Sequence, residues 1–159
     1  MDKRINWTSQ SALEGMLLRY LKSLSSQGKN ALIKKAILGF WLPFAEENNP
    51  RLKAGEAIFE LKSQINALRE GYSVIEGEIP LIQSLDQVSC QFRYKGKEDS
   101  PMARIIRYAE RCYESLNPSE RFYQAIAAFW LPQAGKAWGL TEEELGILAH
   151  HSILKLTEH

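Results

Sequence analysis

The chain has 159 residues, of which 45% are hydrophobic and 25% are charged. This length fits one domain or two very small ones, and the composition provides a packed core, which excludes disordered and collagen-like classes. Lys and Arg together number 20 and Asp and Glu 19, so the net charge is +1. A protein that grips nucleic acid or an anionic membrane over its whole surface carries more positive charge than this.

The chain carries no pattern of a membrane or secreted protein. Its longest apolar stretch, residues 36–45, has ten residues including a proline, whereas a membrane-spanning helix needs about 20. Residues 1–16 lack the apolar centre of a signal peptide. The two cysteines, Cys90 and Cys112, form no disulfide framework and fit a reducing compartment. We therefore expect a soluble, cytoplasmic protein that does not bind membranes.

An internal repeat is the most informative feature of the sequence. Residues 36–45 read AILGFWLPFA and residues 125–134 read AIAAFWLPQA, with seven of the ten positions identical. Chance identity at each position is roughly one in fifteen to twenty, so coincidence is a poor explanation. Self-similarity at a fixed offset indicates duplicated units. We therefore expect two helical units separated by an inserted segment.

The first unit contains three predicted helices. Apolar residues spaced three and four apart predict the first over about 13–24, with Ser11 at its N-cap. The second carries an apolar stripe from Ile33 to Phe44 and is apolar around most of its girth, so it should lie at the centre. The third is predicted to begin at Asn49–Pro50, where asparagine caps and proline takes the first helical position.

The middle segment differs in pattern from both units. Residues 88–94 alternate between apolar and polar, which predicts a short strand. Residues 73–79 are a candidate partner strand, and residues 80–86 a candidate helical turn. A small hairpin and an ordered loop both fit this stretch.

The second unit repeats the helical scheme. Helices are predicted over about 102–114, from an Asn117 N-cap onward, and from a capping box at Thr141 onward. In both units a proline, Pro43 or Pro132, follows the Trp-Leu pair of the central helix. Because proline removes one backbone hydrogen bond, each central helix should kink or end there.

These patterns predict an all-α fold of about six helices. Two three-helix units, residues about 8–72 and 100–158, would pack with pseudo-twofold symmetry. A small β-hairpin or loop insertion would occupy about residues 73–99. Each unit alone is too small for a good core, so residues 1–159 should form a single domain with the central helices joined.

No sequence pattern points to catalysis or to a bound metal. The GxSxG and HExxH motifs and a glycine-rich phosphate loop are absent. His150 and His151 are adjacent, so on a helix they point about 100° apart and do not share a metal as an i, i+4 pair would. We expect a protein that is not an enzyme and uses no cofactor.

Charge is unevenly distributed along the chain. Residues 1–35 carry a net charge of +5, residues 36–90 of −4, and residues 91–111 of +3. Opposed patches without a catalytic set favour a protein-interaction, scaffold or regulatory module whose partner is another protein. No particular oligomeric state is favoured.

One alternative is a nucleic-acid-binding regulator that uses the two basic regions, 1–35 and 91–111. Residues 92–95 interleave aromatic and basic side chains, as single-strand binders do, although an amphipathic strand has the same pattern. The candidate nucleic-acid or partner-binding residues are Arg19, Lys22, Lys34, Lys35, Arg93, Tyr94, Lys95, Lys97 and Arg107.

A second alternative is a small-ligand binder with a cavity between the repeats. That cavity would be lined by Tyr20, Trp41, Tyr108 and Trp130. The duplicated Phe-Trp-Leu stripe fits a packed core better, since large aromatic side chains dominate core packing.

Overall fold

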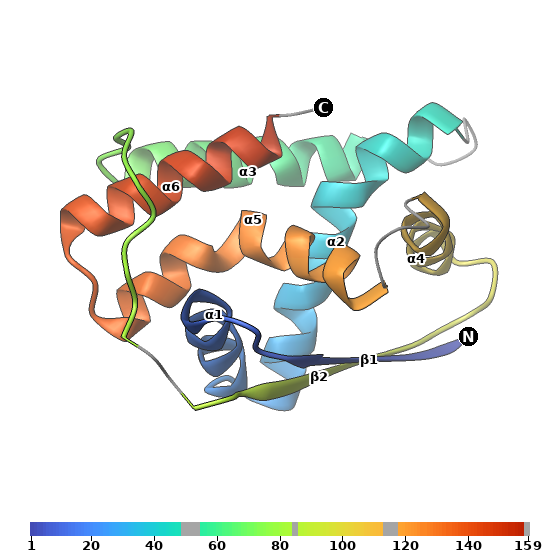
Figure 1. Cartoon of the computed structure of the whole chain (residues 1–159). Helices are drawn as coiled ribbons and strands as arrows, with labels where there is room; N and C mark the ends of the chain where they lie inside the picture. The colour runs from blue at the N-terminus through green and yellow to red at the C-terminus, as the bar shows by residue number, and fades with distance from the viewer. Residues whose placement is uncertain (49–54, 84–85, 113–117, 158–159) are drawn as a thin grey trace.

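The computed structural model describes residues 1–48, 55–83, 86–112 and 118–157. Within these ranges the protein is mostly helical, with six helices and one two-stranded sheet (Figure 1). The fold is therefore mostly helical, as expected, with a small antiparallel sheet in addition. No helix in these ranges is long and apolar enough to cross a membrane. In chain order the elements are β1 (Asp2–Thr8), α1 (Ala12–Lys22), α2 (Ser26–Asn48), α3 (Gly55–Gly71), β2 (Ser89–Lys95), α4 (Pro101–Cys112), α5 (Pro118–Trp138) and α6 (Glu142–Leu156).

The sheet joins the start of the chain to its middle. β1 pairs with β2 in antiparallel register, with Ile5 opposite Phe92. The strand predicted over residues 88–94 is confirmed, but its partner is β1 and not residues 73–79, so of the two arrangements left open for this segment the hairpin does not form. Residues 73–79 contain a glycine and two glutamates, which strands disfavour. The described part of the predicted turn at 80–86 is not helical.

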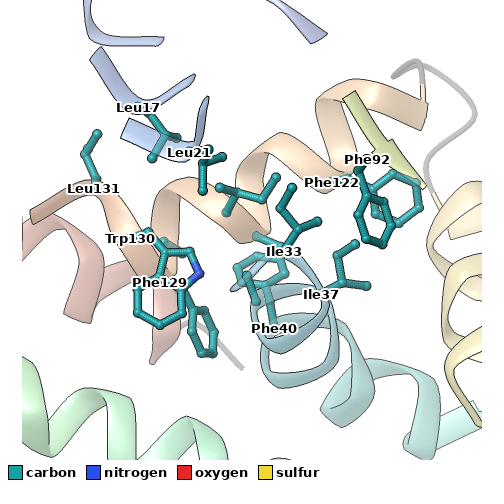
Figure 2. Close-up of a cluster of buried hydrophobic side chains, with 14 of the residues drawn as sticks. Leu17, Leu21, Ile33, Ile37, Phe40, Phe92, Phe122, Phe129, Trp130 and Leu131 are labelled. Carbon is teal, nitrogen blue, oxygen red and sulfur yellow. The ribbon is translucent and has the colours of Figure 1, made fainter. Parts of the chain in front are cut away.

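The two central helices, α2 and α5, pack against each other. Their tryptophans are buried, with Trp41 1% and Trp130 8% exposed. The Phe129 ring lies over Gly39, where any side chain would collide with it. The Trp130 Nε1 donates a hydrogen bond to the Leu32 carbonyl across the helix pair, at 2.9 Å. The repeated aromatic stripe is thus core, together with side chains from α1 and β2 (Figure 2).

Neither central helix ends at its proline. α2 continues past position 43 to Asn48, and α5 contains Pro132 in its interior. Proline disrupts the hydrogen bonds of the preceding helical turn. In α5 that turn includes the Phe129 carbonyl, which accepts a hydrogen bond from the buried Gln64 Nε2 of α3 at 2.7 Å. Pro132 removes the amide partner of the Ala128 carbonyl, four residues earlier, and the hydrogen bond from Gln64 is made at the next residue of the same turn.

Two predicted helix starts are confirmed in atomic detail. The hydroxyls of Ser11 and Thr141 each accept a hydrogen bond from the backbone amide three residues later, both at 3.2 Å. At Thr141 the reciprocal bond of the capping box is also present. The other two predicted starts, Asn49 and Asn117, lie outside the described residues.

The segment between α3 and β2, residues 72–83, runs in extended form along α6 (Figure 1). The Ile75 amide donates to the Gly146 carbonyl at 3.3 Å. Gly146 lies against the Ser73 carbonyl so closely that no side chain fits there. This stretch, which we call the linking segment, is therefore ordered by backbone contact with a helix.

Candidate functional site

The two strands form a ribbon with one face against the helices and one face in solvent. Residues alternate between buried and exposed along β2 and along β1 from Arg4 onward. The inward apolar side chains belong to the core, against α1, α2 and α5. The outward side chains are all exposed, and we call this surface the outer ribbon face. It consists of Asp2, Arg4, Asn6, Thr8, Ser89, Gln91, Arg93 and Lys95.

The strand register arranges these eight side chains in four cross-strand pairs. Two pairs contain only charged residues and two contain only neutral polar residues, so the face has two chemically different ends. We call the first two pairs the charged end and the last two the amide end. The pairs are Asp2 with Lys95, Arg4 with Arg93, Asn6 with Gln91, and Thr8 with Ser89.

The charged end brings two arginines together. Arg4 lies directly opposite Arg93, and like charges in this position destabilise a sheet. Asp2 offsets part of the repulsion, because the Arg93 Nε and Nη2 donate to its two carboxylate oxygens at 3.1 and 2.9 Å. The hydrogen bonds from Arg93 lower the pKa of the Asp2 carboxyl. Three basic and one acidic side chain leave this end positive, in exposed positions that suit an anion.

Two lysines lie near the amide end. Burial raises the pKa of the Cys90 thiol, and the positive charges of Lys29 and Lys22 oppose this rise. Lys29 belongs to the first turns of α2, a helix that begins beside the ribbon (Figure 1). The Ser25 hydroxyl accepts a hydrogen bond from the Gly28 amide at 3.0 Å and caps this end of α2. Glu14 and Glu120 line a hollow together with Asn6 and Thr8, so the charge around the neutral half of the ribbon is mixed.

The aromatic–basic stretch is divided between the two faces of β2. Arg93 and Lys95 point outward, whereas Tyr94 is buried. The Tyr94 hydroxyl shares a hydrogen bond with the Ser100 hydroxyl at 2.8 Å. The Lys34 ammonium lies 5.6 Å from the centre of the Tyr94 ring. The ring is therefore occupied within the protein, and the outer ribbon face presents no aromatic side chain.

Two of the predicted basic residues are engaged elsewhere. Arg19 of α1 lies over the Trp138 ring, 5.7 Å from its centre. Lys35 of α2 forms an ion pair with Glu60 at 3.3 Å and lies 5.8 Å from the centre of the Trp130 ring. The structure does not bring these two to the outer ribbon face.

Lys97 and Arg107 belong to the region that follows β2. Lys97 is exposed, two residues beyond the charged end. Arg107 of α4 donates to the Glu98 carbonyl and lies 3.7 Å from its carboxylate. Lys97 is followed by the exposed Glu98 and Asp99, and Arg107 holds the loop after the strand.

One of the four aromatic residues predicted to line an inter-repeat pocket lies at a cavity. Trp41 lines an apolar cavity of about 400 Å³ formed by α2, α5, α6 and the linking segment. Tyr20, Tyr108 and Trp130 do not line this cavity. Its floor is apolar, with Phe40 beside Trp41 and one buried hydroxyl, Ser152.

Within the described ranges, no group of three or more His, Cys, Asp or Glu side chains is placed to hold a metal ion. The His150 and His151 rings meet edge to face at 6.0 Å between their centres. His151 instead contacts the Gly77 carbonyl at 3.1 Å, which ties α6 to the linking segment.

Sequence reasoning missed most of the outer ribbon face. Six of its eight residues were not among the predicted site residues: Asp2, Arg4, Asn6, Thr8, Ser89 and Gln91. The available signal was the alternation of Ile5 and Trp7 with polar residues, which has the period of a strand. With two apolar residues only, the pattern is short.

No family model, curated protein or solved structure matches this chain.

Proposed function

We propose that this protein binds duplex DNA by placing the outer ribbon face in the major groove. The observation that carries this proposal is the exposed two-stranded ribbon whose outer side chains are all polar, with three basic residues among them. A ribbon at the surface of a small helical protein that served only stability would not need arginines facing each other across the strands.

The dimensions of the ribbon suit the groove. Antiparallel strands lie about 4.8 Å apart, and the major groove of B-DNA, about 12 Å wide, admits a two-stranded ribbon. Arginine, asparagine and glutamine are the side chains that make paired hydrogen bonds to base edges there. The outer ribbon face contains two arginines, one asparagine and one glutamine.

Cations beside the ribbon would contact the phosphates. Lys22 ends α1 and Lys29 lies in the first turns of α2, two helices that contact β2, and Lys97 follows β2 by two residues. The capped start of α2 adds backbone amides and a positive dipole end, which favour anions. Contacts of this kind fix the register of a protein on DNA, whereas base contacts provide specificity.

We also propose that the chain is a duplicated unit of one strand and three helices. The order of elements is the same in both halves, and each contains the Phe-Trp-Leu-Pro sequence in its central helix. Ile5 and Phe92 are the middle residues of their strands and lie opposite each other. A twofold axis through the ribbon requires such pairing of equivalent residues. Each unit would then contribute one of the two strands of the ribbon.

Electrophoretic mobility shift with random-sequence duplex tests this function. Binding should weaken steeply as salt rises, because phosphate contacts release counterions. Replacing Arg4 and Arg93 together with alanine should weaken binding at least tenfold. The charge-matched control is Lys62→Ala with Arg69→Ala, two exposed sites on α3, which should leave binding unchanged. Absence of a shift at low salt, a flat salt response, or equal loss in the control would exclude the proposal.

A protein-interaction function is the second candidate, and exposed apolar side chains favour it. Leu81 of the linking segment is 98% exposed and Ile79 is 43% exposed. A photo-reactive side chain at position 81 should cross-link a partner protein in native lysate, and Ile79→Asp should abolish that product. If position 81 cross-links no more than an exposed polar site such as Ser63, this candidate fails.

A further inference from the structure

Resting on the proposed function, we infer that one chain reads an asymmetric DNA site. G·C pairs would lie under the charged end of the outer ribbon face and A·T pairs under the amide end. This inference rests on the arrangement of the cross-strand pairs. The two charged pairs lie at one end of the ribbon, and the two neutral pairs lie at the other.

A ribbon made by two identical chains has two identical ends and therefore reads a palindrome. Here both strands come from one chain and their outer residues differ. A half-turn about the ribbon centre would place Arg4 where Gln91 lies, and Asn6 where Arg93 lies. The two ends are thus chemically distinct, and one orientation on an asymmetric site is preferred.

The charged end has the chemistry to recognise guanine. An arginine donates two parallel hydrogen bonds to the O6 and N7 atoms of guanine, which is the commonest specific contact in the major groove. Arg4 and Arg93 are both exposed. The two hydrogen bonds to Asp2 hold the Arg93 guanidinium in a fixed plane. The Asp2 carboxylate can in turn accept from the amino group of a cytosine.

The amide end has the chemistry to recognise adenine and thymine. An asparagine or glutamine amide donates to N7 and accepts from N6 of adenine, a pattern that guanine does not present. Asn6 and Gln91 face outward and lie opposite each other. Beyond them the Thr8 and Ser89 hydroxyls share a hydrogen bond at 3.3 Å, and the threonine methyl suits contact with the thymine methyl.

The test is selection of duplexes from a random window by the full chain, followed by fluorescence anisotropy. The selected site should be non-palindromic, with G·C at one end and A·T at the other. The full chain should bind it one to one. Duplexes that repeat either half as a palindrome should bind roughly five- to a hundredfold more weakly, since each lost paired contact costs about 1–3 kcal/mol.

One double variant and one single variant assign the ends. Asn6→Ala with Gln91→Ala should abolish discrimination at the A·T end and preserve it at the G·C end, and Arg4→Ala should do the reverse. All these positions are exposed, and unchanged circular dichroism confirms folding. A palindromic site, two chains per site, or loss of preference at the wrong end overturns this inference while the proposed function stands. Failure to bind any duplex overturns both.

Discussion

Gly39 is the residue at which α2 makes room for a ring of α5. Alanine favours a helix interior over glycine by about 1 kcal/mol, but a methyl group here collides with the buried Phe129 ring. Overpacking of this kind costs about 1–3 kcal/mol. We therefore expect Gly39→Ala to destabilise the protein despite its better propensity, and Gly39→Leu to destabilise it further, in urea unfolding.

The matched control for this substitution is Gly71→Ala. Gly71 ends α3 and has open space where a side chain would project, so the same change should leave the free energy of unfolding equal or higher. Equal stability changes at Gly39 and Gly71 would show that contact with the ring is not the cause.

The ion pair between Asp2 and Arg93 makes one carboxyl a sensitive probe of the charged end. Arg93 lowers the pKa of Asp2 below 3.8, so the pair stabilises the fold above about pH 4, and this contribution is lost as the pH falls through the lowered value. In a carbon-13 NMR titration, Asp2 should have its midpoint below 3.8, and Arg93→Gln should move it upward. An unchanged midpoint in Arg93→Gln would assign the shift to another charge.

At the scale of elements, a single glutamine couples α3 to α5. The buried Gln64 Nε2 binds the Phe129 carbonyl in the turn before Pro132. Gln64→Leu removes the donor and leaves a buried carbonyl without it, which costs about 1–3 kcal/mol. Thermal unfolding should record this loss, whereas Asn66→Leu at an exposed site of α3 should change stability little. Equal losses of thermal stability in Gln64→Leu and Asn66→Leu would mean that the hydrogen bond does not stabilise the fold.

The helices could be predicted from the sequence because each carries enough residues for its period to be counted. The capping residues Ser11 and Thr141 also predicted the starts of α1 and α6, because a cap is a local interaction. The pairing of β1 with β2 could not be predicted in this way. It depends on contact between distant segments, and β1 contributes only Ile5 and Trp7 as an apolar signal. The outer ribbon face was missed for the same reason. Its side chains come from two distant segments, and only the register of the two strands places them on one surface.

At the scale of the whole molecule, the ribbon unites both halves of the chain. Ile5 is 4% exposed and packs in the same core as α2 and α5. Ile5→Ala should cost about 2–5 kcal/mol, and unfolding should remain one transition by both circular dichroism and tryptophan fluorescence. A surface control, Leu81→Ala at a side chain that is 98% exposed, should change stability by less than about 0.5 kcal/mol. Two separate transitions would refute a single cooperative domain.

The distance along the chain between the paired strands has a consequence for biosynthesis. Thr8 and its partner Ser89 are 81 positions apart, so a ribosome that has just released β1 must still translate α1, α2 and α3 before the complementary strand exists. During that interval the edge of β1 offers its unused amides and carbonyls to any other extended peptide nearby. Helix formation is fast and local, so α1 and α2 have time to form before β2 is made.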